Sequence, residues 1–418
     1  MSDIIIVGGR VFDGIGSVPR QVAIRISRGR IAAVGAREEV GGGPDTRVID
    51  VAGKFVMPGM IDCHVHLTSH AGPDSEMRRL KDLVPLQALR GAANAAAILR
   101  AGFTTVRDLS APGYANIAIR DAIDQGLAVG PRVLAAGTSL TVPGGHGDNY
   151  YRPEVTVLRE NLINGAESAR LAVRQTVKMH ADLIKLLVTG GVMTDGSDVG
   201  ALQWTPDELS AAIEQAHQLG RRVAGHCHGA IGVKEGVKAG LDTVEHGTML
   251  DEEAIDLLGE RGVYLIPTLV AGHNIVSNGA AAGIAPHVVR KAEQIGDWHR
   301  RSVRMAHEGG VKIAFGTDCG TLFNRAGENA AELELMVQQG IAPSEALESV
   351  TRVAAEALGL ADELGTLEAG KAADLVVIDG DPLANIALMR DPERIVWVFK
   401  GGEAVKQPEA APVAVAAR

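Results

Sequence analysis

Two histidines, His64 and His66, end the stretch MPGMIDCHVH at residues 57–66, and their type and spacing suit metal binding. Side chains at positions i and i+2 of a β-strand lie on the same face, so the two imidazole rings point the same way. Neutral imidazole is a common ligand of divalent metal ions, and two convergent rings can bind one ion together. The pair alone is equally compatible with histidines that have structural partners, so the rest of the chain must decide.

Further metal-binding side chains follow other apolar stretches. After residue 57, short apolar runs alternate with amphipathic stretches, which predicts alternating strands and helices. The predicted strands are 60–66, 103–109, 132–137, 182–188, 221–226, 242–247, 263–269 and 311–318. His226 and His228 end the fifth strand, His246 ends the sixth, and Asp318 ends the eighth. Scattered core histidines have no reason to gather at strand ends, so this pattern favours a metal site.

Alternating strands and helices over roughly 300 residues predict an α/β fold of the (β/α)8 TIM-barrel type. An open doubly wound sheet is the alternative, but no G-x-G-x-x-G follows an early strand. We predict the barrel over residues 58–363, and a small β-sandwich domain from residues 1–57 plus 364–418, where short β-type runs return. Catalytic groups of such barrels lie at the carboxyl ends of the strands, so the residues named above should meet at one rim.

Lys185 lies in the middle of the apolar strand DLIKLLV, between Ile184 and Leu186. Burial of an ammonium group is costly, so the pKa of this lysine should fall. A neutral amine can add carbon dioxide and become a carbamate, an anion with two oxygens that could bridge two cations. The structural alternative is a lysine whose ammonium group reaches solvent at the barrel rim.

The composition limits the function. The chain has 418 residues, a net charge of −10, 46% hydrophobic residues and no basic cluster, so we expect neither nucleic acid nor a membrane as a partner. The N-terminus does not resemble a signal peptide, and no apolar run has the ~20 residues that span a bilayer, which favours a cytoplasmic location. The three cysteines, Cys63, Cys227 and Cys319, are too few and too dispersed for a disulfide framework and should be buried apolar residues.

Taken together, these residues resemble the binuclear metal centre of the amidohydrolase superfamily, and the resemblance covers nearly the whole chain. It implies that His64, His66 and Asp318 hold the more buried metal ion. It also implies that His226 and His246 hold the more exposed ion, and that carboxylated Lys185 bridges both. The implied cofactors are two divalent metal ions, with zinc expected, and carbon dioxide or bicarbonate for the carboxylation.

Four segments, VPGGHGD, IKLLVTGGV, HCHGA and TVEHG, are similar to one branch of the superfamily. This branch contains prolidase-like Xaa-Pro dipeptidases, lysine/arginine carboxypeptidases and ochratoxin-hydrolysing amidases, which cleave an amide next to a C-terminal amino acid. The resemblance implies that His228 polarises the scissile carbonyl and that His146 and Val192 line the substrate pocket. It also implies a homo-oligomer, such as an octamer.

The chemistry of two metal ions with Asp318 predicts hydrolysis without a covalent nucleophile. Two cations that share a water make hydroxide available, and Asp318 can accept its proton and return it to the leaving amine. We therefore predict a hydrolase of dipeptides or N-acyl amino acids. Alternatives are a hydantoinase-like cyclic amide or imide hydrolase, a lactone hydrolase, a mononuclear deaminase and a metal-free structural relative.

A C-terminal carboxylate in the substrate needs a cationic or donor-rich clamp. The candidates are His146, Arg107 after the second strand, Tyr150 and Tyr151. Arg107 is also adjacent to Asp108, so an ion pair between these two is the competing expectation.

Overall fold

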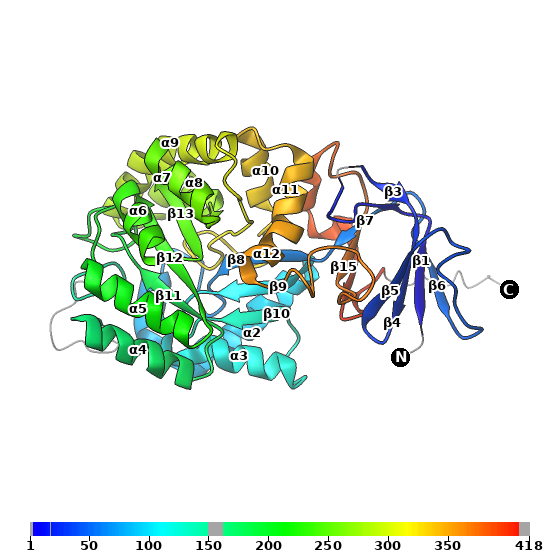
Figure 1. Cartoon of the computed structure of the whole chain (residues 1–418), viewed down its shortest axis with the longest axis horizontal. Coiled ribbons are helices and arrows are strands. Elements are labelled where there is room, and N and C mark those ends of the chain that lie inside the picture. Colours follow the sequence, from blue (N-terminus) through cyan, green and yellow to red (C-terminus); the bar gives the residue numbers. More distant parts are fainter. Residues whose placement is uncertain (1–2, 17, 149–161, 409–418) are drawn as a thin grey trace.

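A computed structural model describes residues 3–16, 18–148 and 162–408, and it confirms the predicted TIM barrel with an additional β domain beside it (Figure 1). Neighbouring strands of the barrel pair in parallel, in the orders β10-β9-β8 and β11-β12-β13-β14. The barrel strands are β8 (Met60–Val65), β9 (Phe103–Asp108), β10 (Arg132–Ala135), β11 (Leu183–Leu187), β12 (Arg222–Gly229), β13 (Thr243–Met249) and β14 (Tyr264–Ile266).

The eighth predicted strand, 311–318, closes the barrel but is not a continuous strand. It makes single parallel bridges, from Ile313 to Leu265 of β14 and from Cys319 to Val65 of β8. Between these bridges Phe315 donates its N–H to the carbonyl of Ser349, outside the barrel. Asp318 has a φ of 60°, which is incompatible with an extended strand. The N–H of Asp318 still donates to the carbonyl of His64 at 2.7 Å, so the segment stays hydrogen-bonded to β8 where a functional side chain is expected.

Helices surround the barrel strands, and no helix of the described ranges is long and apolar enough to span a bilayer. In Figure 1, α7, α8 and α9 lie on one side of the barrel and α2 and α3 on the other. The helices are α1 (Ser75–Lys81), α2 (Val84–Arg100), α3 (Ala115–Asp124), α4 (Ala166–Lys178), α5 (Pro206–Gln218), α6 (Ala230–Ala239), α7 (Glu252–Arg261), α8 (Leu269–Ala282), α9 (Pro286–Glu308), α10 (Ala331–Gln338), α11 (Pro343–Glu348) and α12 (Ala354–Leu358). The shorter helical turns are η1 (Pro112–Tyr114), η2 (Ser349–Val353), η3 (Ile386–Arg390) and η4 (Pro392–Arg394).

Helix α5 begins with a capping box, which its sequence TPDELS predicts. The hydroxyl of Thr205 accepts a hydrogen bond from the backbone N–H of Glu208, and the Glu208 carboxylate accepts one from the Thr205 N–H at 3.0 Å. We expect Thr205→Ala to lower the free energy of unfolding by about 1 kcal/mol, because an N–H at the helix start loses its partner. Urea denaturation measures the change, with Thr205→Ser as the control, and an unchanged midpoint would contradict the expectation.

Strands from both ends of the chain form the β domain (Figure 1). One sheet has the order β5-β4-β1-β6 and the other β17-β16-β15-β7-β2-β3, so N-terminal β7 pairs with C-terminal β15, antiparallel from Leu375 opposite Pro58. The strands are β1 (Ile4–Val7), β2 (Arg10–Val11), β3 (Arg20–Gln21), β4 (Ala23–Ser27), β5 (Arg30–Gly35), β6 (Arg47–Asp50), β7 (Phe55–Pro58), β15 (Leu375–Ile378), β16 (Ile395–Lys400) and β17 (Glu403–Lys406).

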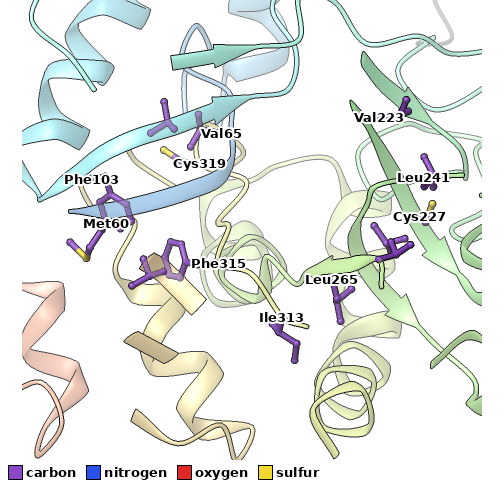
Figure 2. Packing of buried hydrophobic residues seen from close by; sticks show 14 of the residues in the cluster. Met60, Val65, Phe103, Val223, Cys227, Leu241, Leu265, Ile313, Phe315 and Cys319 are labelled. Atoms are coloured by element: carbon purple, nitrogen blue, oxygen red, sulfur yellow. The ribbon is translucent and has the colours of Figure 1, made fainter. Parts of the chain in front are cut away.

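Buried apolar side chains pack in the barrel core at the amino ends of β8 and β9. Met60, Phe103 and Phe315 pack together there (Figure 2), and the rings of Phe103 and Phe315 are 5.6 Å apart between centroids.

Cys227 and Cys319 belong to the same core, and Cys63 is also buried. All three are free, and burial raises the pKa of their thiols. The prediction that they are buried apolar residues is confirmed.

Candidate active site

The side chains predicted from the strand ends meet in one cavity of about 340 Å³. The cavity lies at the carboxyl ends of β8, β11, β12 and β13 and at the segment that closes the barrel. Its lining includes every predicted metal ligand and three of the other predicted site residues: His64, His66, Lys185, His226, His246 and Asp318, with His228, His146 and Val192. Side chains from distant parts of the sequence thus converge as the barrel rule predicts.

The first group in the cavity consists of His64, His66 and Asp318. Asp318 Oδ1 lies 3.3 Å from Nε2 of His64 and 3.1 Å from Nε2 of His66. The Nδ1 atom of His66 lies 3.3 Å from the carbonyl oxygen of Ser110, which directs Nε2 into the cavity. Two imidazole nitrogens and a carboxylate oxygen are typical ligands of zinc and similar cations.

The second group consists of His226, His228 and His246, which each offer a ligand nitrogen within 4.8 Å of the others. Burial, followed by the neighbouring imidazoles, lowers the pKa of all three well below the ordinary value. They are therefore neutral at pH 7, the form that binds metal. The nitrogen positions alone do not separate His228 from the two histidines that the family resemblance assigns to the metal.

Hydroxyl groups orient two rings of this second group. Thr248 Oγ1 lies 2.6 Å from Nδ1 of His228, and Thr268 Oγ1 lies 2.7 Å from Nδ1 of His246. His246 and Thr268 have positive φ angles, 74° and 52°. Such conformations are costly for residues other than glycine and persist where the surrounding structure enforces them, often at functional sites.

Lys185 lies in the cavity floor with its Nζ atom buried and without a hydrogen-bond partner among the described residues. Burial lowers the pKa of this amine to about 8, and the nearby Arg107 cation acts in the same direction. The Nε2 atom of His226 is also buried and has no hydrogen-bond partner in the described ranges. Buried nitrogens of this kind beside the Asp318 carboxylate fit a site for divalent cations.

Asp62 connects the first strand to the segment that closes the barrel. Its carboxylate accepts hydrogen bonds from the backbone N–H of His64 at 3.0 Å, from the Thr317 hydroxyl at 2.6 Å and from Asn329 Nδ2 at 2.8 Å. Because Thr317 precedes Asp318, the buried Asp62 carboxylate fixes the position of His64 relative to Asp318.

Arg107 does not line the cavity, and the prediction that it contacts substrate is corrected. Its guanidinium lies inside the barrel, where Nη2 donates to Oε1 of Glu245 at 2.6 Å. The competing expectation of a pair with Asp108 is also wrong, because successive side chains of β9 point to opposite faces. The ion pair is structural and joins β9 to β13.

His146 and Val192 line the cavity opposite the strand ends. The ring of His146 stacks on that of His226 with 4.4 Å between centroids, and its Nδ1 lies 2.9 Å from Thr194 Oγ1. Burial lowers the pKa of His146 to about 4. A neutral imidazole is a hydrogen-bonding group rather than a cationic clamp for a carboxylate. Tyr150 and Tyr151 lie outside the described residues.

Residues 55–405, most of the chain, match the amidohydrolase family. The chain belongs to the amidohydrolase family. This amidohydrolase is 30% identical to ochratoxinase of Aspergillus niger over 439 aligned residues, which cover 98% of the chain and 88% of the relative. Its structure is similar to that of an Xaa-Pro dipeptidase with methionine bound in the active site, with a TM-score of 0.90, 34% identity and coverage of 97% and 100% of the two chains. A prolidase in complex with N-methylphosphonate-L-proline superposes with a TM-score of 0.89 at 32% identity, with the same coverage.

Two further residues at the site of this amidohydrolase were not among the predicted site residues. Glu245 is fully buried, and its Oε2 lies 2.9 Å from Nδ1 of His64. Glu245 could have been found from the sequence, because it is a charged residue within an apolar strand, as Lys185 is. His299 of α9 lines the cavity, with its Nε2 buried and unpaired. The helical period could have identified it, because His299 shares the buried face of α9 with Val288, Ala292, Val303 and Ala306.

Proposed function

We propose that this amidohydrolase cleaves the amide bond of dipeptides or N-acyl amino acids and releases the C-terminal amino acid. One observation carries the proposal: the partnerless amine of Lys185 lies among neutral histidines and Asp318 in a cavity that can hold a small substrate. The similar structures support the choice of bond. A phosphonate on the nitrogen of proline has the tetrahedral shape of an amide under attack, and that ligand is bound to a prolidase of 32% identity.

In this proposal the chain supplies two groups of ligands. His64, His66 and Asp318 would hold one divalent cation, His226 and His246 the other, and carboxylated Lys185 would connect them. The cations, with zinc expected, would activate a water molecule and polarise the substrate carbonyl. Burial lowers the pKa of His64, His226 and His246, so these rings need lose no proton to bind a cation. His66 differs, because Asp318 raises its pKa against the effect of burial, and metal binding there would release a proton.

Asp318 is suited to move the proton. Burial opposes its ionisation, but His64 and His66 hold the pKa of this carboxyl below its ordinary value. Asp318 is therefore an anion at neutral pH and can accept a proton from the attacking water and return it to the leaving amine. If the Thr248 hydroxyl donates to Nδ1 of His228, the Nε2–H of His228 remains to donate to the substrate carbonyl oxygen.

The test is mass spectrometry of a pooled library of dipeptides and N-acyl amino acids after incubation with enzyme reconstituted with zinc and bicarbonate. We expect free C-terminal amino acids, and the amounts released will identify the preferred residue. Asp318→Asn serves as the inactive control. A protein that holds two metal ions per chain and releases no amino acid would contradict the proposal, and cyclic imides and lactones would then be the substrates to examine.

A further inference from the structure

Arg107, Glu245 and His64 form a continuous series of buried contacts beneath the cavity. Arg107 of β9 contacts Glu245 of β13, with Nη2 and Oε1 2.6 Å apart. The second carboxylate oxygen of Glu245, Oε2, lies 2.9 Å from Nδ1 of His64 at the end of β8. The side chains of Arg107, Glu245 and His64 are almost completely excluded from solvent. The contacts therefore run from a fixed cation, through a carboxylate, to the first histidine of the cavity.

The surroundings hold the guanidinium and the carboxylate in one orientation. Arg107 also donates from Nε to the carbonyl of Cys63 at 2.6 Å and from Nη1 to the Thr243 hydroxyl at 3.0 Å. The same hydroxyl donates to Oε1 of Glu245 at 2.5 Å. One oxygen of Glu245 thus has two donors, and the other is free to face His64.

Oε2 of Glu245 and Nδ1 of His64 have no other hydrogen-bond partner among the described residues than each other. Oε2 of Glu245 and Nδ1 of His64 are both buried, and neither makes a fully aligned hydrogen bond to any described residue. They are already at hydrogen-bonding distance, so a small rotation of the ring aligns them. Two buried polar atoms without other partners gain most by pairing.

The partner of a ring nitrogen decides which nitrogen carries the proton. A carboxylate or a carbonyl oxygen only accepts, so a short contact at Nδ1 favours an N–H there and a lone pair at Nε2. Nε2 of His64 also faces an acceptor, Oδ1 of Asp318, but at 3.3 Å, farther than the 2.9 Å between Nδ1 and Glu245. Glu245 is the nearer acceptor for His64. His66 lies between two acceptors, with the Ser110 carbonyl 3.3 Å from Nδ1 and Asp318 Oδ1 3.1 Å from Nε2, so these contacts do not select Nδ1–H. His228 and His246 face threonine hydroxyls, which can donate or accept and do not select a tautomer.

We propose that Glu245, paired with Arg107, is the positioning residue that sets His64 as an Nε2 ligand, so that this member of the His64–His66–Asp318 site is preset before metal binds. The proposal rests on the metal site of the proposed function, but not on its substrate. Carboxylate partners of ligating histidines act in this way in many metal sites.

The variant Glu245→Gln tests this role directly. If the glutamine oxygen keeps its contacts with Arg107 and Thr243, its amide NH2 faces His64 and requires an acceptor at Nδ1. The ring proton then moves to Nε2, the atom that should bind metal. Nitrogen-15 NMR of the full-length, metal-free protein reports the tautomer, with the His64 signals assigned from His64→Asn. We expect Nδ1–H in the wild-type protein and Nε2–H in the variant.

Metal affinity provides a second measurement. Competition with a chromophoric zinc chelator should show one of the two zinc ions bound about 10- to 100-fold more weakly in Glu245→Gln, the usual effect of removing such a partner. The other ion should keep its affinity. Glu245→Asp retains an acceptor and should keep the Nδ1–H tautomer. Glu208→Gln alters a carboxylate of the α5 capping box and should change neither measurement.

A wild-type His64 with its proton on Nε2 would overturn the proposal even if Glu245→Gln does not fold. Unchanged affinity for both zinc ions in a folded Glu245→Gln would overturn it as well. A protein that has the expected tautomer and loses one ion in the variant, but cleaves no amide, would contradict only the proposed function.

Discussion

Replacement of Lys185 by alanine is expected to reduce both metal loading and amide hydrolysis. The lysine lies in the cavity without a hydrogen-bond partner among the described residues, and in the proposed site its carbamate would help to hold both cations. We expect the variant to bind fewer than two zinc ions per chain. Its kcat/KM should fall by at least about 10²- to 10³-fold, the effect of losing one charge-stabilising group at an active site. Elemental analysis and steady-state kinetics measure the two effects.

Two controls make this result specific. Lys238→Ala removes an exposed lysine of α6 and should leave both measurements unchanged. A small carboxylate such as propionate can occupy the space left by the Lys185 side chain and should restore part of the activity of Lys185→Ala. If Lys185→Ala retains two ions and the wild-type rate, the lysine is not a bridging ligand.

The rate of carboxylation should depend on pH. Burial lowers the pKa of Lys185 to about 8, so the neutral amine that reacts with carbon dioxide increases as pH rises through 8. Metal-free enzyme incubated with bicarbonate and zinc should therefore become active faster at pH 8.5 than at pH 6.5. The comparison is made at equal dissolved carbon dioxide, and equal rates at the two pH values would contradict a reaction of the neutral amine.

Replacement of Arg107 by leucine is expected to destabilise the fold strongly. The change leaves the fully buried carboxylate of Glu245 without its cation, and breaking a buried ion pair in this way costs roughly 3–5 kcal/mol. The carbonyl of Cys63 also loses its donor. Urea denaturation of the full-length protein should show a lower midpoint. The surviving folded enzyme should keep its KM, because Arg107 does not line the cavity.

A double variant separates charge from packing in this prediction. Arg107→Leu with Glu245→Leu removes both charges, so it should be more stable than Arg107→Leu alone, although it loses the partner of His64. If Arg107→Leu instead has wild-type stability and a raised KM, Arg107 binds the substrate carboxylate, a role that the structure does not support.

The barrel and the polar side chains that line its cavity could be predicted from the sequence because both depend on local patterns. Strand and helix periods are visible in short windows, and the carboxyl ends of parallel strands meet at one face of any such barrel. His64 and His66 share a face by strand alternation alone. Lys185 was identified because a charge inside an apolar strand is anomalous without any knowledge of its neighbours.

Only the tertiary structure decided which buried charges pair and how each ligand is oriented. Arg107 and Glu245 are 138 residues apart, and Arg107 reaches its partner across the barrel interior rather than along its own strand. The partner of each imidazole, whether carboxylate, carbonyl or hydroxyl, likewise comes from another element. Residue type and period are properties of the local chain. Register and contact between distant strands depend on packing of the whole barrel, which a single sequence does not display.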